Sequence, residues 1–211
     1  MILPAKTPAF VEYLFSNRIW RMPINERTLY LTFDDGPHPR ITNKVLDMLA
    51  HYNAKATFFC IGHRVAEHPD TYARILNEGH AVGNHTHRHL NGWETDDDMY
   101  MEDIHHASGY IDSKLFRPPY GRMTNSQFKK TSLMGLKTVM WTVISADYEK
   151  SLSKESCAER TLNNISQGAI YLFHDSEKAE SNMMYALSSL LKAASEQGYR
   201  FKKINQHSLL G

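Results

Sequence analysis

Cysteine is scarce in this sequence, and long hydrophobic runs and a surplus of either charge are absent. The 211 residues include two cysteines, Cys60 and Cys157, too few and too far apart for a disulfide framework or a cysteine metal site. No apolar stretch is long enough to span a membrane. Lys and Arg number 24 and Asp and Glu number 23, so the net charge of +1 gives no electrostatic case for nucleic acid. We therefore expect neither nucleic acid nor a membrane as a partner.

The first residues also lack the pattern of a secretory signal peptide, because Pro4, Lys6, Pro8 and Glu12 interrupt them. We therefore expect a cytoplasmic protein, with an exported mature form as the alternative. A chain of this length fits one large domain. The expected organisation is an N-terminal extension packing on a barrel. The sequence leaves the oligomeric state open.

Short strand-like apolar runs alternate with longer helix-like stretches along the chain. Strict alternation predicts a parallel sheet with right-handed crossovers. The helix predicted at 71–78 is expected to turn Ile75 and Leu76 inward. The predicted strands are 28–33, 56–60, 81–83, 115–117, 137–143, 169–173 and 200–204. The predicted helices are 41–51, 71–78, 96–115, 125–134, 154–165 and 183–196.

Chemically reactive side chains follow several of these strands: Asp34 and Asp35, His85 and His89, Arg117, Asp147, and His174. In a closed barrel the C-terminal ends of all the strands converge on one face, and active sites are built there. An open doubly wound sheet would instead concentrate such residues at one switch point. We therefore expect an α/β fold of the barrel type with about seven strands.

Two histidines, His85 and His89, lie four residues apart in the segment 84–89 (NHTHRH). On a helical turn, this spacing places both imidazoles on one face, where they can share a metal ion, while His87 points away. A histidine-rich surface loop is the alternative, since the chain has 12 histidines.

Two adjacent carboxylates, Asp34 and Asp35, follow the first predicted strand in the segment 32–37 (TFDDGP). Adjacent carboxylates repel each other unless a cation is near, although a polar strand-to-helix turn is the alternative. Together with the histidine pair, one Asp and two His form a ligand set that leaves coordination positions open for catalysis. Non-haem iron oxygenases use the same set, so an oxygenase is a competing interpretation.

Four segments occur in a fixed order: 32–37 (TFDDGP), 85–89 (HTHRH), 117–121 (RPPYG) and 172–175 (LFHD). With these segments the chain resembles the polysaccharide deacetylase (NodB homology) family, carbohydrate esterase family 4, over most of its length. The resemblance implies a distorted (β/α) barrel as a catalytic domain of residues 28–211, preceded by an extension of residues 1–27. It also implies hydrolysis of N-acetyl groups on sugars, such as N-acetylglucosamine in peptidoglycan or chitooligosaccharides.

The resemblance further implies a divalent metal ion as cofactor. Its ligands would be Asp35, His85 and His89, and the metal would be zinc, with cobalt or nickel as alternatives. Asp34 would act as general base on a metal-bound water that serves as nucleophile. His174 would act as general acid and protonate the leaving amine.

Five more residues are assigned supporting roles by the same resemblance. Arg117 would orient the general base, and Asp147 would hold the imidazole of the general acid and raise its pKa. Pro119, Tyr120 and Leu172 would contact the substrate. The backbone N–H of Tyr120 would help to bind the oxyanion, and Leu172 would face the acetyl methyl group.

One segment departs from the family pattern. The family usually has Asp-x-x-Asp-Trp after the fifth strand, whereas here Ile144 replaces the first Asp and Tyr148 replaces the Trp. The second Asp is present as Asp147. The wall of the substrate groove is therefore altered, and we expect short glycans as substrates in place of long polymers.

Other functions stay open on the sequence. Within the same fold, the substrate is alternatively a small non-sugar amide or an O-acetyl ester of xylan. A different class would be a metal-dependent oxygenase or a glycan-binding protein without turnover. Asp34, Arg117 and His174 argue against this class, because an oxygenase has no obvious use for an acid and a base, and a binding protein would be free to lose them.

Overall fold

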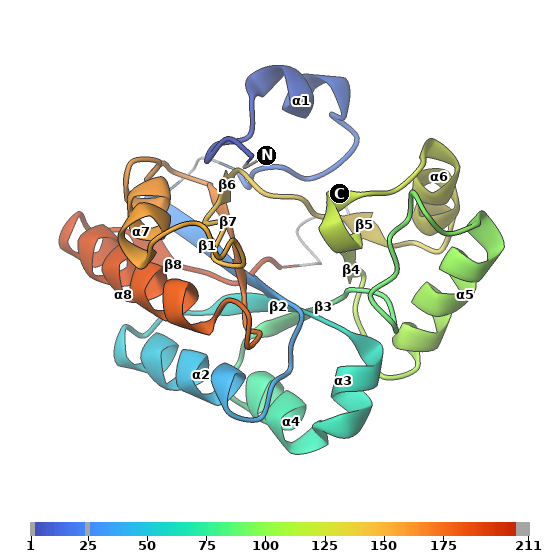
Figure 1. The fold of residues 1–211 in the computed structure, drawn as a ribbon, viewed down its shortest axis with the longest axis horizontal. Helices are drawn as coiled ribbons and strands as arrows, with labels where there is room; N and C mark the ends of the chain where they lie inside the picture. Colours follow the sequence, from blue (N-terminus) through green and yellow to red (C-terminus); the bar gives the residue numbers. More distant parts are fainter. Residues whose placement is uncertain (1–2, 24–25, 206–211) are drawn as a thin grey trace.

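The computed structural model describes residues 3–23 and 26–205, which form a curled parallel sheet surrounded by helices (Figure 1). Parts of the predicted extension and of the predicted catalytic domain fall on residues 1–2, 24–25 and 206–211, which lie outside the described residues. The strands are β1 (Thr28–Asp34), β2 (Ala56–Cys60), β3 (Ala81–Asn84), β4 (Leu115–Phe116), β5 (Lys137–Thr138), β6 (Val143–Ile144), β7 (Ile170–His174) and β8 (Arg200–Phe201).

All strand pairs are parallel, and their order in the sheet is β5-β4-β3-β2-β1-β7-β6, with β8 beside β1. The long strands β1, β2 and β7 lie in the middle of this order. The register aligns Asp34 at the end of β1 with His174 at the end of β7. The sheet curls into an incomplete barrel whose two edges are β5 and β6, and the predicted distorted barrel is confirmed.

The two faces of β1 explain why its C-terminal end can carry a polar site. Leu31 and Phe33 point outward into the main hydrophobic core beneath the helices. Thr32 and Asp34 point to the interior, where both contact Arg117. The alternation of side chains along the strand thus directs the first carboxylate of the 32–37 segment into the barrel.

The helices form a ring around the strands, with α1 standing apart at one edge (Figure 1). Apolar side chains of α2, α4, α7 and α8 belong to the main hydrophobic core, and α7 and α8 also pack on each other. The helices are α1 (Ala9–Leu14), α2 (Ile41–His51), α3 (Gly62–Glu67), α4 (Pro69–Asn77), α5 (Asp97–Ser108), α6 (Asn125–Leu133), α7 (Lys154–Leu162) and α8 (Glu180–Glu196), with a short 3₁₀ turn, η1 (Pro119–Gly121).

The single strand predicted at 137–143 is wrong. Two short strands, β5 and β6, occupy this segment and pair with different partners, β4 and β7. Between them the chain crosses the open side of the barrel, where the Thr142 hydroxyl donates to the carbonyl of Trp20. The apolar segment 137–143 therefore contains the point where the chain passes from one edge of the sheet to the other.

The helix predictions also need correction in three respects: one boundary, the burial of one residue, and two helices that were not predicted. The helix predicted at 96–115 ends at Ser108, because the chain must turn back to enter β4 at Leu115. Leu76 is 45% exposed instead of buried, since α4 packs through Ile75 on its other side. Neither α1 nor α3 was predicted from the sequence, because each is only six residues long.

The N-terminal segment lies across the open side of the barrel. Lys6 forms an antiparallel bridge with Val143, and Ile19 forms a parallel bridge with Val139. Arg21 forms an antiparallel bridge with Ala169, the residue before β7. The described part of the extension therefore supplies backbone hydrogen bonds where β5 and β6 do not pair with each other.

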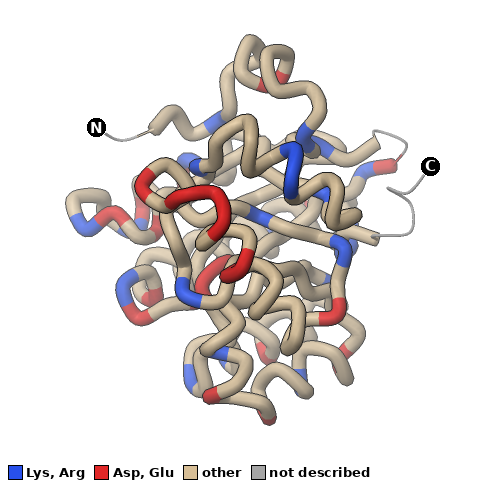
Figure 2. The backbone as a smooth tube through the Cα atoms, turned by 90° about the vertical axis from the view of Figure 1, so that its right-hand side faces the viewer, with Lys and Arg blue, Asp and Glu red and all other residues tan. Residues whose placement is uncertain are grey.

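Charges of both signs are mixed on the face formed by α5 and α6 (Figure 2). Lys130 of α6, for example, pairs with Asp97 and Asp98 of α5. A positive side chain of α6 thus lies beside the acidic residues at the start of α5. Among the described residues, no helix combines the length and apolar character needed to cross a membrane.

Candidate active site

Nine of the ten residues predicted for the site lie at the C-terminal ends of strands or in the loops that follow them, and Leu172 lies within β7. Asp34 and His174 end β1 and β7, and Arg117 follows β4. His85 follows β3 directly. The parallel sheet therefore brings together side chains that are up to 140 residues apart in sequence, as the register of Asp34 with His174 shows.

Arg117 is completely buried and holds Asp34. Its Nη1 donates to Asp34 Oδ1 at 2.8 Å and to the Thr32 hydroxyl at 2.7 Å. Its remaining donors bond the carbonyl oxygens of Val139 and Met140, and its guanidinium lies over the Phe59 ring. A buried guanidinium whose three nitrogens all donate hydrogen bonds keeps the neighbouring carboxylate in one orientation. Asp34 itself is only 3% exposed.

His85 is oriented by a hydrogen bond from its far ring nitrogen. Its Nδ1 lies 2.7 Å from the carbonyl oxygen of Arg117, so Nδ1 carries the proton and donates it. Nε2 is then free, and it lies 3.8 Å from Asp34 Oδ2 and 3.9 Å from Asp35 Oδ1. Burial lowers the pKa of His85 to about 4, so the imidazole is neutral, as a metal ligand must be.

Asp35, His85 and His89 present one potential ligand atom each, all within 4.8 Å of one another. His89 Nε2 lies 3.3 Å from Asp35 Oδ1. That oxygen is buried and has no hydrogen-bond partner within the described part of the chain. Burial alone raises the pKa of Asp35, but the contact with His89 and the positive charge of His174 outweigh it, so the net pKa lies below its usual range. A charged oxygen without a partner is what a cation would complete.

The helical turn predicted for the 85–89 segment is wrong. The segment is an irregular loop in which Thr86 and His89 have left-handed backbone angles, with φ of 64° and 59°. The loop still brings the two imidazoles together, with ring centroids 5.1 Å apart. His87 points away, as predicted, and stacks on His106 of α5 at 3.8 Å.

His174 and Asp147 form a closed pair on the other side of the site. The His174 Nδ1–H donates to Asp147 Oδ1 at 2.8 Å, and the His174 backbone N–H donates to Oδ2 at 2.8 Å. Burial alone lowers the pKa of His174, but the charge and the hydrogen bond of Asp147 outweigh it and raise the pKa to about 9. The imidazole therefore carries a proton at neutral pH.

The turn after β1 leaves no room for a side chain at Gly36. A Cβ at this position would lie 2.2 Å from the carboxylate of Asp175. Asp175 is buried, accepts a hydrogen bond from the Thr42 hydroxyl, and donates its backbone N–H to the carbonyl of Asp34. Burial raises the pKa of Asp175 to about 7. No role was predicted for Asp175 from the sequence, although it belongs to the 172–175 segment.

The predicted substrate contacts lie around these groups. Pro119 and Leu172 are buried, whereas Tyr120 is 61% exposed and has a left-handed φ of 60°. The Tyr120 ring packs edge-on against His89, with centroids 4.7 Å apart. On the opposite side, Tyr148 packs edge-on against His174 at 5.0 Å. Two tyrosines thus flank the two histidines.

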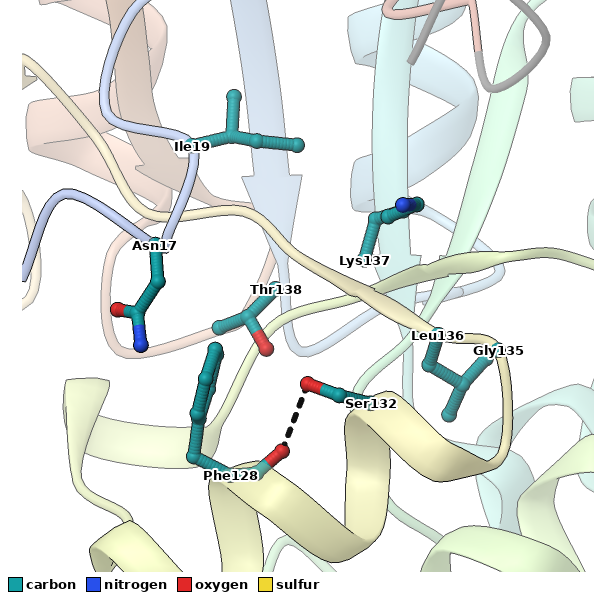
Figure 3. Close-up of a pocket in the computed structure, with 8 residues that line it drawn as sticks. All are labelled: Asn17, Ile19, Phe128, Ser132, Gly135, Leu136, Lys137 and Thr138. Carbon is teal, nitrogen blue, oxygen red and sulfur yellow. Dashed lines mark hydrogen bonds between the residues drawn. The ribbon is translucent and has the colours of Figure 1, made fainter. Parts of the chain in front are cut away.

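A separate pocket of about 280 Å³ lies on the outer side of β5, against α6 and the N-terminal segment (Figure 3). It is lined by Asn17, Ile19, Phe128, Ser132, Gly135, Leu136, Lys137 and Thr138. None of the ten predicted site residues lines this pocket. Three groups with altered pKa values, Asp35, His85 and His174, lie instead at the strand ends described above, which is where we place the candidate active site.

The parallel barrel and the residues at its strand ends define the class of the protein as a barrel hydrolase, and comparison with known proteins gives the family. A profile described as polysaccharide deacetylase matches residues 21–139. The chain is 36% identical to a peptidoglycan-N-acetylglucosamine deacetylase of Bacillus cereus over 193 residues, covering 89% of this chain and 91% of the relative. It is 35% identical to a chitooligosaccharide deacetylase of Azorhizobium caulinodans, covering 74% and 77%.

Among solved structures, the peptidoglycan N-acetylglucosamine deacetylase Bc1960, bound to an N-oxidanyl-benzamide, superposes with a TM-score of 0.85. It is 30% identical, and the match covers 94% of this chain and 95% of the other. The chain therefore belongs to the polysaccharide deacetylase family. It is a deacetylase-type hydrolase that acts on carbon–nitrogen bonds other than peptide bonds.

Proposed function

We propose that the protein removes N-acetyl groups from N-acetylglucosamine residues of peptidoglycan-type or chitooligosaccharide-type glycans with the help of a divalent cation. One observation carries this proposal. The Asp35, His85 and His89 triad lies at the same barrel end as a buried carboxylate, Asp34, and a protonated histidine, His174. Amide hydrolysis needs a base for water, a charge to stabilise the oxyanion and an acid for the nitrogen. The relatives named above support the choice of substrate.

The residues of the triad fit a metal ion of the zinc type. Two neutral imidazoles and one carboxylate form a common catalytic zinc ligand set, with cobalt and nickel as alternatives. The unpartnered oxygen of Asp35 and the free Nε2 of His85 support a metal-binding role for the triad. When bound, the cation would supply Lewis-acid polarisation of the acetyl carbonyl and make a water more acidic.

Asp34 would accept the proton of the attacking water. Its Oδ1 is occupied by Arg117, whereas its Oδ2 faces His85 at 3.8 Å and therefore the triad. Because Arg117 fixes the carboxylate, this second oxygen has a defined direction, which favours proton transfer at one point in the site.

His174 would give a proton to the nitrogen of the leaving amine. Its Nδ1 is bonded to Asp147, so Nε2 is the atom that can donate. With a pKa of about 9, the imidazole is protonated when the reaction begins, and Asp147 stabilises that form. Leu172 is buried beside this histidine in β7 and would face the acetyl methyl group, and Tyr120 would offer its backbone N–H to the oxyanion.

The exposed position of Tyr120 favours a glycan over a small enclosed amide as substrate. An aromatic side chain that is 61% exposed beside His89 suits the face of a sugar ring. Tyr148, at the position where the family usually has Trp, is the basis for expecting short glycans. Hydrolysis of xylan O-acetyl esters uses the same groups and is the alternative.

The cytoplasmic location expected from the sequence stays a prediction.

The test is acetate release from a panel of substrates by the full chain, stripped of metal and then supplied with zinc, cobalt or nickel. The panel holds N-acetylated oligosaccharides of two to six sugars, insoluble chitin, peptidoglycan, acetylated xylan and small acetamides. The proposal expects metal-dependent release from short N-acetylated glycans. Exclusive hydrolysis of xylan esters or small amides would overturn the substrate assignment, and equal rates on insoluble chitin and short oligosaccharides would overturn the preference for short chains.

A further inference from the structure

The loop that carries two of the proposed ligands has an unfavourable backbone conformation. Thr86 and His89 have φ values of 64° and 59°, a region that residues other than glycine rarely occupy. The segment from His85 to His89 forms neither a helix nor a strand of its own. Its geometry must therefore be held by contacts from elsewhere in the fold.

Asp103 of α5 supplies such contacts. Its side chain is 1% exposed, and its Oδ2 accepts hydrogen bonds from two consecutive backbone N–H groups, those of His87 at 2.7 Å and Arg88 at 2.9 Å. These two peptide groups lie between His85 and His89. One carboxylate oxygen therefore holds both backbone N–H groups in the middle of the loop that joins the two imidazoles.

Other contacts reach different atoms of the loop. The carbonyl of Thr86 accepts from the backbone N–H of Gly62 at 2.9 Å, and the carbonyl of His87 accepts from the backbone N–H of His63 at 3.2 Å. Asn84 Oδ1 accepts from the backbone N–H of Thr86 at 2.8 Å, and the Thr86 hydroxyl accepts from the N–H of Leu90 at 3.2 Å. His85 is tied to Arg117 through its ring. Within the described residues, Asp103 is the side chain that bonds the backbone N–H groups of His87 and Arg88.

The second oxygen of Asp103 has a different task. Its Oδ1 accepts a hydrogen bond from Arg88 Nε at 2.6 Å, and the Arg88 side chain is 56% exposed. This ion pair compensates the charge of a buried carboxylate. The two oxygens thus separate two effects, holding the backbone and neutralising the charge, and different variants can remove them one at a time.

We propose that Asp103 is a positioning residue that sets the affinity of the site for its divalent cation by holding the 85–89 loop through backbone N–H groups. The inference rests on the proposed metal-dependent function. Asp103 touches neither the triad nor any substrate, so it acts through the loop alone. The ion pair with Arg88 contributes little to metal affinity, because both backbone N–H bonds to Oδ2 remain when the Arg88 side chain is removed.

Zinc titration of the metal-stripped full chain, by calorimetry and by competition with a chromophoric chelator, tests this proposal. Asp103→Ala should weaken zinc binding about 10-fold to 100-fold, as loss of outer-shell support does. Asp103→Leu fills the same space without an acceptor and is the second variant if the alanine protein does not fold. Asp103→Asn keeps one carbonyl oxygen for both N–H groups, so its zinc affinity should stay within about threefold of the wild type.

Two matched controls separate positioning from general loss of stability. Arg88→Gln removes the ion pair and leaves the backbone bonds, so zinc affinity should change by less than about threefold. Ile104→Ala removes a buried side chain on the same helix and should lower the melting temperature without changing the zinc Kd of the folded protein.

The outcomes are distinguishable. Asp103→Ala or Asp103→Leu with wild-type zinc affinity overturns the positioning role, and so does an equal loss in Ile104→Ala. A loss in Arg88→Gln as large as in Asp103→Ala shows that the charge, not the backbone contact, is responsible. A wild-type protein that does not bind zinc, cobalt or nickel would overturn the proposed function itself.

Discussion

The two sides of the candidate site are built in different ways. On one side, Asp147 and His174 form two hydrogen bonds of 2.8 Å and are complete without any ligand. On the other side, Asp35 Oδ1 lies 3.3 Å from His89 Nε2 and 3.9 Å from His85 Nε2, and this buried oxygen has no well-formed hydrogen bond inside the described part of the protein. The groups of the first side satisfy each other within the folded chain, whereas those of the second side are arranged to bind a cation.

This difference says which contacts folding alone can supply. A histidine and a carboxylate on neighbouring strand ends satisfy each other and need only the register of the sheet. Three groups that converge on a shared point repel or leave atoms unsatisfied, so the loops that carry them need support from other elements. Perturbing the two sides should therefore have separable effects on metal content and on proton transfer.

Metal removal should have the largest effect, because it empties one side and leaves the other intact. Exhaustive chelation is expected to abolish acetate release, and zinc or cobalt should restore it. Activity is measured beside metal content by elemental analysis. Full turnover in protein shown to be metal-free would contradict the proposed division of the site.

The adjacent carboxylates Asp34 and Asp35 allow the effects on proton transfer and on metal binding to be compared at neighbouring positions. Asp34→Asn should keep the metal, since Asp34 lies with Arg117, yet lose about 10³-fold or more in kcat because an amide cannot accept the proton of water. Asp35→Ala should instead weaken metal binding and lose activity as a consequence, with partial rescue by excess zinc. The assignment fails if Asp34→Asn loses its metal while Asp35→Ala retains it.

His174→Ala addresses the side that is complete without ligand. Loss of the proton donor should lower kcat by about 10²-fold or more, while zinc content and zinc Kd stay at the wild-type level. Steady-state kinetics combined with elemental analysis checks both parts. Near-normal turnover in this variant would rule out His174 as the general acid.

The sequence predicted the strongly patterned elements best. The limits of β2 and α2 match the prediction because a fully buried strand and a regular apolar stripe are encoded locally. The 137–143 segment was predicted as one strand because nothing in its local sequence marks the point where the chain leaves one sheet edge for the other. Such changes depend on pairing with distant strands, which a local pattern does not contain.

The site shows the same limit. The types and spacing of its chemically reactive residues were visible in four short segments, and the fold brings these residues together. The shape of the 85–89 loop was not visible, because left-handed angles at Thr86 and His89 are imposed by contacts with distant elements. Asp103 and Asp175 were also missed as supports for the site, since no spacing rule relates a helix carboxylate to the loop that it holds.

Asp147→Asn should have the smallest effect on the rate at neutral pH and the clearest effect on its pH dependence. The charge and the hydrogen bond of Asp147 are the main causes that raise the pKa of His174 to about 9 against the effect of burial. The neutral amide removes the charge, so the pKa of His174 should fall. Because a general acid is active below its pKa, the high-pH limb of kcat/KM should move to lower pH, with a larger loss at pH 8 than at pH 6.

The same pair links stability to pH, and the sign can be checked in metal-stripped protein. His174 has a folded pKa above its unfolded value of about 6.5, so its stabilisation is complete below pH 6.5 and is lost as pH rises towards about 9. The free energy of unfolding, measured by urea denaturation between pH 6 and 10, should fall across this window in the wild type by on the order of 3 kcal/mol. In Asp147→Asn this fall should largely vanish, whereas Tyr148→Phe, which keeps the ring beside His174 and leaves Asp147 in place, should retain it. An unchanged slope in Asp147→Asn would mean that the protonated histidine is held by something other than its carboxylate partner.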